Sequence, residues 1–289
     1  MILPPPVVSA AATHIRAGSR SAVTRCLPEE VPVAMVYGGS TQAVMMASPA
    51  DLKDFAVGFS LTEGIVTDPA QIERLEVMAH PKGIEAQMWL AGERSEAMAA
   101  RRRFMAGPVG CGLCGIDSLD EAVRALPDLS GVGPCLDAAQ IAQATEDLRR
   151  WQPFHDQTRA VHAAGFLMPG QGIVLAREDV GRHNALDKLI GAMARQGLRG
   201  ADGAFVLTSR VSVEMVQKCA MAGGAVLIAV SAPTAHALRL AQASGITLAA
   251  FARGEGFDLF SHPERLRAEM RALSSENPLA PEKDASHVA

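Results

Sequence analysis

Aromatic side chains are scarce in this sequence: they make up 4% of its 289 residues, with one tyrosine and two tryptophans. Stacking platforms for bases or sugars are therefore not expected. Neither sign of charge dominates, since 27 Lys and Arg residues face 31 Asp and Glu residues, whereas a general nucleic-acid binder is clearly basic. The longest apolar run, around Gly223 to Ala232, has roughly half the length that a bilayer span requires. A hydrophobic fraction of 48% excludes disorder of the whole chain. The composition and the absence of a long apolar run therefore predict a soluble protein with an aliphatic core.

Cysteines are few and odd in number. The chain has five, namely Cys26, Cys111, Cys114, Cys135 and Cys219. An odd count in a chain of this length does not fit a secreted disulfide scaffold and favours a reducing compartment. Two of them, Cys111 and Cys114, form the only C-x-x-C motif.

The N-terminal segment does not have the features of a secretory signal. No positive charge precedes an apolar stretch, and Pro4, Pro5 and Pro6 interrupt any helix. Three arginines with no acid before Glu29 give a faint likeness to an organelle transit peptide. A flexible extension over residues 1–28 is the simpler interpretation, because chain ends are commonly disordered. The polar composition of residues 273–289 predicts a flexible tail.

Hydrophobic patterning divides the remaining chain into two parts. Residues 31–46 predict a hairpin that turns at Gly38-Gly39-Ser40, and a capped helix follows Ser48-Pro49. With two further strands, these elements predict a smaller α+β domain over residues 29–108. Farther along, three near-continuous apolar strands alternate with helices, which predicts a layered α/β sheet with parallel strand pairs and helices on both faces. We assign this sheet and the C-x-x-C loop to residues 109–272.

The C-x-x-C motif has three functional interpretations: a redox dithiol, half of a zinc site, or a nucleophile that carries sulfur. A thioredoxin-type motif opens a helix after a strand, whereas here glycines flank both cysteines. Zinc is disfavoured because no second cysteine pair or histidine pair has the required spacing. A glycine-flanked dithiol close to Arg101, Arg102 and Arg103 suits a thiolate on a mobile loop, since positive charge favours the thiolate. The alternative is a tight turn whose cysteines only pack.

Several junctions between a strand and a helix carry polar residues. The densest runs from Arg177 to Lys188 and includes His183, where a helix N-terminus could bind an anion. An ordinary helix capped by Asp179, with exposed charges, explains the same residues equally well. Arg210 follows the next strand, and the stretch Phe251-Ala252-Arg253-Gly254-Glu255-Gly256 follows the last one. Together these junctions predict one ligand-binding edge if the strands are parallel.

Long motifs in this order resemble the formate dehydrogenase accessory sulfurtransferase family. They are GCGLCG, EDVGRHNALDKLIG, TSRVSVEMVQKCAMAG, AVSAPTAHALRLAQASGITLAAFARG and SHPERL, and FAVGFSLTEGIV is similar to the N-terminal part of that family. The resemblance covers about residues 30 to 268. It implies a cytosolic, homodimeric sulfurtransferase, with a larger domain similar to the cytidine deaminase fold, that formate dehydrogenase requires for activity.

The resemblance also implies roles for individual residues. Cys111 would accept persulfide sulfur from a cysteine desulfurase, with Cys114 as its partner, and pass it to the molybdenum cofactor, bis-molybdopterin guanine dinucleotide. The residues expected to bind the cofactor are Phe251, Ala252, Arg253, Gly254, Glu255 and Gly256, together with His183 and Arg210. Since glycine has no side chain to contact a phosphate at position 256, Arg253 would supply the charge. A non-catalytic chaperone for the same cofactor is the alternative function.

Overall fold

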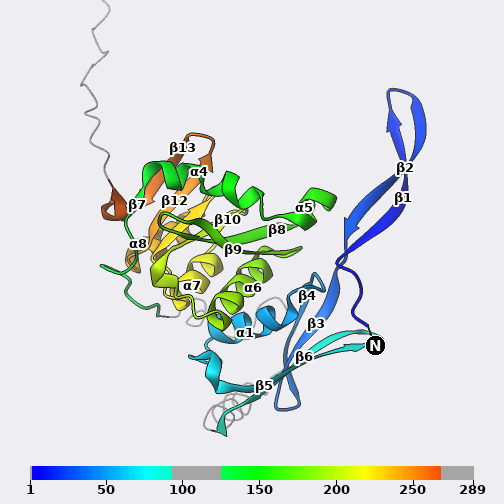
Figure 1. The fold of residues 1–289 in the computed structure, drawn as a ribbon, viewed down its shortest axis with the longest axis horizontal. Coiled ribbons are helices and arrows are strands. Elements are labelled where there is room, and N and C mark those ends of the chain that lie inside the picture. Colours follow the sequence, from blue (N-terminus) through cyan, green and yellow to red (C-terminus); the bar gives the residue numbers. More distant parts are fainter. Residues whose placement is uncertain (1, 93–124, 268–289) are drawn as a thin grey trace, which may run out of the picture.

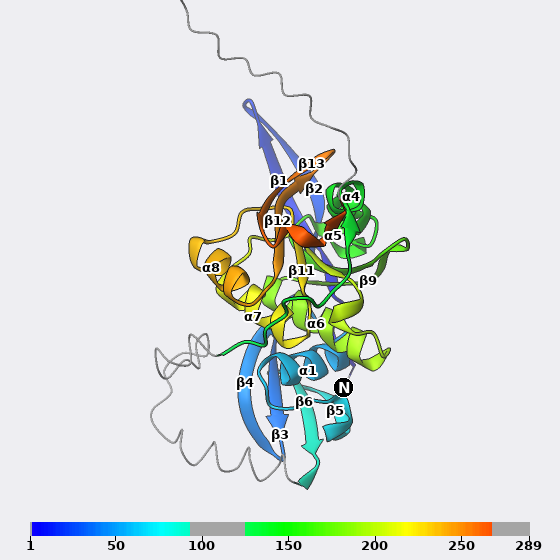
Figure 2. The same ribbon diagram turned by 90° about the vertical axis from the view of Figure 1, so that its left-hand side faces the viewer.

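The structure, a computed structural model, describes residues 2–92 and 125–267. Its largest element is a six-stranded mixed sheet in the order β13-β12-β11-β10-β8-β9. The strands are β8 (His162–Met168), β9 (Gly172–Asp179), β10 (Ala204–Leu207), β11 (Val226–Ala229), β12 (Thr247–Arg253) and β13 (Gly256–Ser261). Helix α4 (Ala138–Arg149) covers one face, and α6 (Arg182–Arg195), α7 (Val213–Met221) and α8 (Ala235–Ala243) cover the other (Figures 1 and 2).

The central strands of this sheet explain its layered form. Every residue of β10 and of β11 is buried, and β10, β11 and β12 run parallel to one another. Short, wholly apolar strands of this kind are stable only when helices shield both faces. The predicted α/β sheet with parallel pairs is confirmed, whereas the likeness to the cytidine deaminase fold stays a prediction.

A second, four-stranded sheet forms the N-terminal lobe. Its order is β4-β3-β6-β5, with β3 (Val31–Tyr37), β4 (Ser40–Ala47), β5 (Ile72–His80) and β6 (Gly83–Leu90). Helix α1 (Leu52–Thr62) covers one face, where alternate residues of β6 from Ile84 to Leu90 are buried. The predicted turn at Gly38-Gly39 is confirmed, and both glycines have positive φ.

The two lobes are joined where α1 crosses α6 (Figure 1). A Cβ atom at Gly58 would lie 1.7 Å from the carbonyl oxygen of Asp187, and one at Gly191 would lie 1.8 Å from that of Asp54. Only glycine permits backbones to approach this closely. The lobes therefore pack as one layered body: α4, the six-stranded sheet, α6 and α7, α1, and the four-stranded sheet.

Residues 7–28 form an antiparallel hairpin of β1 (Val7–Arg16) and β2 (Ser19–Pro28), which projects from the body (Figure 1). The expected extension over residues 1–28 did not include this hairpin. The missed signal is the turn at Ala17-Gly18, where both residues have positive φ, between runs that contain several β-branched residues. The boundary predicted near residue 108 and the tail predicted over 273–289 lie outside the described residues.

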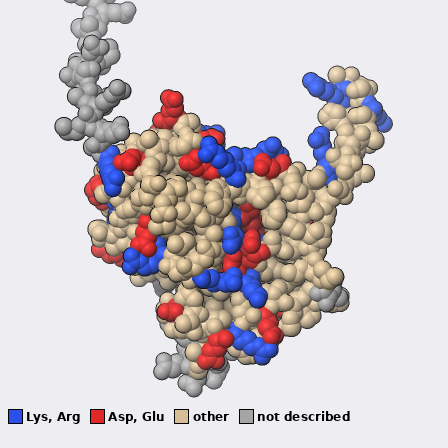
Figure 3. All heavy atoms as spheres, viewed as in Figure 1, with Lys and Arg blue, Asp and Glu red and all other residues tan. Residues whose placement is uncertain are grey.

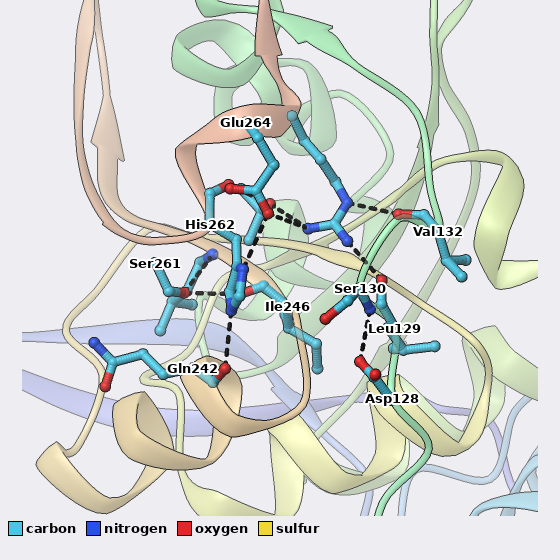
Figure 4. A network of polar contacts seen from close by, with 12 residues as sticks. Asp128, Leu129, Ser130, Val132, Gln242, Ile246, Ser261, His262 and Glu264 are labelled. Atoms are coloured by element: carbon cyan, nitrogen blue, oxygen red, sulfur yellow. Dashed lines mark hydrogen bonds and ion pairs between the residues drawn. The ribbon is translucent and has the colours of Figure 1, made fainter.

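The buried side chain of Arg265 holds residues 129–132, near the start of the second described range, against the six-stranded sheet. The Arg265 guanidinium donates hydrogen bonds to the carbonyls of Leu129 and Val132 and to the Thr247 hydroxyl. Figure 4 shows Leu129 and Val132 facing this network, beside His262 and Glu264. The SHPERL motif is thus an anchor for residues 129–132.

The remaining elements are short. Strand β7 (Leu136–Asp137) pairs with β14 (Leu266–Arg267), and α5 (Pro153–Thr158) follows α4. The 3-10 helices among the described residues are Pro69–Gln71, Gly200–Asp202 and Pro263–Arg265.

Candidate functional site

A pocket of about 520 Å³ lies at the edge of the six-stranded sheet where the parallel strands end. Its walls include Val180 after β9, Thr208 after β10 and Val230 after β11, with α4 and α5 on the other side. Ligands in open α/β sheets bind at this edge. The volume falls within the roughly 300–1,000 Å³ typical of small-molecule sites. A cavity therefore lies at the edge of the sheet where the sequence predicts a ligand, and ligand binding there stays a prediction.

Basic side chains from the α4–α5 region line this pocket. Arg149 ends α4, His155 lies in α5, and Arg159 follows α5 with a φ of 57°. Arg149 forms an ion pair with Asp156, and its hydrogen bond lowers the pKa of that carboxyl group. Two arginines at one pocket suit a ligand that carries phosphate groups, because guanidinium and phosphate form paired hydrogen bonds.

Buried Glu178 holds α5 in place beside the pocket. Its carboxylate oxygens accept hydrogen bonds from the backbone N–H groups of Phe154 and His155, each at 2.8 Å. Burial raises the pKa of Glu178, while these two hydrogen bonds oppose the rise. Because α5 and the residues after it supply His155 and Arg159 to the wall, Glu178 positions part of the pocket without lining it.

His162 lines the pocket and lies within electrostatic reach of Arg182 at the start of α6. Burial lowers the pKa of His162, and the positive charges of Arg182 and His155 lower it further. The buried Nε atom of Arg182 has no hydrogen-bond partner among the described residues, and neither has Nε2 of His183. Unsatisfied buried polar atoms are rare in folded proteins, and both residues stand at the start of α6, outside the set that lines the pocket.

The predicted binding stretch from Phe251 to Gly256 is a hairpin rather than a loop after the last strand. Strand β12 runs to Arg253, and β13 returns from Gly256. The Ala252 carbonyl accepts a 2.6 Å hydrogen bond from Thr145, which lines the pocket, and Arg253 donates one to the Val230 carbonyl at 3.2 Å. Arg253 therefore lies at the rim of the pocket, whereas none of the six residues is among those that line it.

Phe251 has a strained backbone within that stretch. Its φ of 53° is unusual for a residue with a bulky side chain, and the pairing register of β12 with β13 shifts between Ala250 and Arg253. The ring is 47% exposed and lies 6.3 Å from that of Phe260. Strain of this kind is concentrated at functional sites.

His183 and Arg210 lie at the same edge but do not line the pocket. His183 begins α6, and its Nε2 atom is 3.8 Å from a carboxylate oxygen of Glu214 in α7. Burial, and secondarily Arg182, lower the pKa of His183 to about 4. Arg210 is exposed two residues after the pocket residue Thr208. The structure thus brings Arg253 to the pocket, and places His183 on the side of the sheet covered by α6 and α7.

Most polar residues of the EDVGRHNALDK motif bind the N-terminal lobe. Fully buried Lys188 and Asp179 form an ion pair at 2.6 Å, and Lys188 donates to the carbonyl of Ser48. Asp179 also accepts hydrogen bonds from the Ser48 N–H and from Asn184. Asp179 is not the cap of α6, since that position is Gly181. Both earlier interpretations of these residues, an anion site and a capped helix with exposed charges, were therefore wrong for this pair.

A second buried ion pair lies beside the first. Lys218 in α7 contacts the Asp187 carboxylate at 2.9 and 3.0 Å and also binds Thr62 and Glu63 at the end of α1. Burial raises the pKa of Asp187, and Lys218 opposes the rise. These contacts tie α1, α6 and α7 together, so two of the longest sequence motifs serve the packing of the lobes.

The predicted catalytic residues Cys111 and Cys114 lie outside the described residues. Of the other cysteines, Cys219 is fully buried, and burial raises the pKa of its thiol, whereas Cys135 is exposed. Among residues 2–92 and 125–267, no three His, Cys, Asp or Glu side chains are grouped as metal ligands would be. Within the same ranges, no helix is both long and apolar enough to cross a membrane.

Comparison with known proteins decides the family. The model of the FdhD/NarQ family matches residues 28–267. The chain belongs to this family. It is 53% identical over 256 residues to the sulfur carrier protein FdhD of Agrobacterium fabrum, a match that covers 89% of this chain and 94% of that protein. FdhD of Brucella abortus is 54% identical over 84% of this chain and 90% of its own length.

A solved structure supports the same assignment to the FdhD/NarQ family. A candidate formate dehydrogenase accessory protein from Desulfotalea psychrophila aligns over 91% of this chain and all of its own, with a TM-score of 0.73 and 26% identity. The mixed α/β architecture is therefore shared with an experimentally determined relative.

Sequence reasoning missed the basic wall of the pocket. Arg149 and Arg159 stand in no motif, and no sequence pattern placed them at the edge of a sheet. His162 also lines the pocket. The only sequence feature that could have indicated the basic wall is the presence of three arginines between residues 149 and 159 of a chain with a net negative charge.

Proposed function

We propose that this chain is a sulfur carrier that serves formate dehydrogenase. The observation that carries the proposal is the match over residues 28–267, which spans Cys111 and Cys114, to a family whose curated relatives are named sulfur carrier proteins. The solved relative, named as a candidate formate dehydrogenase accessory protein, supports the choice of enzyme.

In the proposed first step, the Cys111 thiolate attacks the terminal sulfur of a persulfide on a cysteine desulfurase. A sulfur–sulfur bond to Cys111 forms while the sulfur–sulfur bond on the desulfurase breaks, and the desulfurase cysteine leaves as its thiolate. The exchange needs no other oxidant or reductant. Cys111 then carries a persulfide, and the proposed recipient is the molybdenum cofactor bound as cargo.

The pocket supports a nucleotide-bearing cargo. Arg149 and Arg159 line it, and Arg253 lies at its rim. These groups fit the phosphates of a guanine dinucleotide. A cavity of about 520 Å³ suits one such moiety, whereas bis-molybdopterin guanine dinucleotide carries two. Hence one pocket would hold one end of the cargo.

Sulfur loading tests the first step. The protein is incubated with a cysteine desulfurase and cysteine, and the peptide that contains Cys111 is examined by mass spectrometry. We expect one added sulfur atom, which is lost in Cys111→Ala and retained in Cys135→Ala, an exposed cysteine outside the motif. Loading that persists in Cys111→Ala refutes the assignment.

Complementation separates sulfur transfer from the chaperone alternative. In cells that lack this protein, the double variant Cys111→Ala/Cys114→Ala should fail to restore formate dehydrogenase activity while still binding GDP in vitro. Restored activity with both cysteines absent would favour a chaperone that binds and delivers the cofactor without transferring sulfur.

A further inference from the structure

The His162 ring is a half-buried group in the pocket that forms no hydrogen bond with another described residue. It belongs to the first residue of β8, so it reaches the pocket from the sheet, whereas Arg149 and Arg159 reach it from the α4–α5 side. Thr208 also lines the pocket from the sheet, but its hydroxyl accepts a 2.8 Å hydrogen bond from the Ala163 N–H and donates one to the Ala163 carbonyl. On the sheet side, the His162 ring is therefore the polar group that is open to a ligand.

The formal charges around the pocket cancel when its histidines are neutral. Arg149 and Arg159 carry positive charges. They are matched by the negative charges of Glu146, which lines the pocket, and of Asp156, the ion-pair partner of Arg149. Figure 3 shows the same mixture, with acidic atoms among the Lys and Arg atoms over α4 and α5. A diphosphate adds a negative charge for each phosphate group, so Arg253 at the rim offsets only part of it.

Of the two histidines that line the pocket, His162 is the one available to supply the remaining charge. The Nδ1 atom of His155 donates a 3.3 Å hydrogen bond to the Val161 carbonyl. The His155 ring also lies within electrostatic reach of two carboxylates, those of Asp156 and Glu178. His155 is thus already engaged by groups of the protein, whereas the His162 ring is not.

The surroundings of His162 favour its neutral form until an anion binds. Burial lowers the pKa of this ring, Arg182 and His155 lower it further, and Asp179 opposes them. A histidine titrates near neutral pH, so a modest change in its surroundings alters its charge. A phosphate group beside the ring would favour the charged form, because an opposite charge within about 4–6 Å raises the pKa of a histidine.

We propose that His162 binds a phosphate group of the cargo together with Arg149 and Arg159, and that it takes up a proton from the solvent as this group binds. No covalent bond forms or breaks, and the proton returns to the solvent when the cargo leaves. This inference rests on the proposed function, in which the cargo carries a guanine dinucleotide. The pocket therefore holds its cargo more tightly in mildly acidic solution than in mildly basic solution.

Binding of GDP-mannose tests the proton uptake. Its diphosphate has an ester at each end, so its charge stays constant over this pH range, whereas the terminal phosphate of GDP titrates near pH 6. Calorimetry at pH 6 in MES and in Bis-Tris, two buffers with different ionisation enthalpies, gives the number of protons taken up. We expect between about 0.2 and one proton per GDP-mannose, and an affinity about threefold or more higher at pH 5.5 than at pH 8.

Three single variants assign the proton to one ring. His162→Gln keeps a hydrogen-bonding side chain that cannot be charged, so it should abolish both the uptake and the gain in affinity at low pH. His155→Gln should retain the uptake, and His236→Gln, at an exposed position of α8, should behave as the unchanged protein does. Glu178 has a raised pKa, but its protonation removes an acceptor that holds α5 and would weaken binding at low pH. It cannot produce the expected gain.

The possible results separate this inference from the proposed function. GDP-mannose that binds without proton uptake, or with an uptake that persists in His162→Gln, overturns the role of His162 and leaves cargo binding in place. If neither GDP-mannose nor GDP binds, the proposed cargo site is wrong and the role of His162 is wrong with it. Because the uptake is measured on the unchanged protein, the test does not depend on whether His162→Gln folds, which circular dichroism establishes.

Discussion

Replacing Lys218 by methionine should destabilise the protein strongly, because it leaves a buried carboxylate without its cation. Asp187 is 1% exposed and lies 2.9 Å from the Lys218 ammonium group. After the replacement, the Thr62 hydroxyl remains as a donor to Asp187, while the carboxylate of Glu63 would lose its ion pair with Lys218. Methionine fills a similar volume, so the change tests charge more than packing.

The expected loss is about 3–5 kcal/mol in the free energy of unfolding, the cost of removing one partner from a buried ion pair. A total stability of roughly 5–15 kcal/mol is typical of native proteins, so this single change removes a large fraction of it. The double variant Asp187→Asn/Lys218→Met removes both charges and should recover most of the loss, because replacing a whole buried pair is often nearly neutral.

Urea unfolding measures these differences as shifts of the midpoint at an unchanged slope. Lys53→Met, at an exposed position of α1, is the matched control and should stay within about 0.5 kcal/mol of the unchanged protein. The deficit of Lys218→Met should also shrink as the pH falls from 7 toward 4. Burial raises the pKa of Asp187 in the folded state, and protonation removes the cost of the unpaired charge.

Two results would refute this reasoning. A Lys218→Met variant within about 1 kcal/mol of the unchanged protein would mean that the ion pair contributes little beyond a surface pair. A double variant no more stable than the single variant would mean that the loss comes from packing or from the Thr62 and Glu63 contacts rather than from an unpaired charge.

Three further predictions concern the pocket, the edge of the sheet and the anchor. Arg149→Ala/Arg159→Ala should weaken GDP binding at least about tenfold in calorimetry, since each charge-assisted hydrogen bond contributes about 1.5–3 kcal/mol, while exposed Arg150→Ala should bind as the unchanged protein does. Between pH 7 and 5, the unchanged protein should lose about 2 kcal/mol in the free energy of unfolding, measured in urea, because the pKa of His183 is about 4 in the folded state and only the unfolded state binds the proton in that range. His183→Gln should not show this loss. Arg265→Met should cost about 2–4 kcal/mol by the same assay, because two buried carbonyls lose their donor, and equal stability would show that water replaces the guanidinium.

Local patterns predicted much of the fold. The Gly38-Gly39 turn and the buried strands β10 and β11 follow from backbone freedom and from continuous apolar runs, and both depend on residues adjacent in sequence. The β1–β2 hairpin was missed because its strands are exposed, so they lack the alternation of apolar and polar residues that marks a strand with one buried face.

The candidate site was only partly predictable. The edge of the sheet follows from the parallel strands, and Arg253 lies at that edge, whereas its expected contact with a cofactor stays a prediction. Asp179 and Lys188 were misjudged because a charged residue at a helix start looks the same in sequence whether it meets a ligand or a second lobe. The second lobe lies there because α1 and α6 cross in contact at Gly58 and Gly191. These two glycines are 133 positions apart in the chain, so no local pattern predicts their contact.

The sequence by itself determined the family, through long motifs that span both lobes, and the layered α/β class, through apolar runs that only a sheet covered on both faces can bury. The tertiary structure alone decided which charged residues surround a pocket and which fasten the lobes together. The physical reason is that a charge acts over distances of a few ångströms in space, whereas the contacts that fasten the lobes join residues more than a hundred positions apart, such as Lys188 with Ser48 and Lys218 with Thr62.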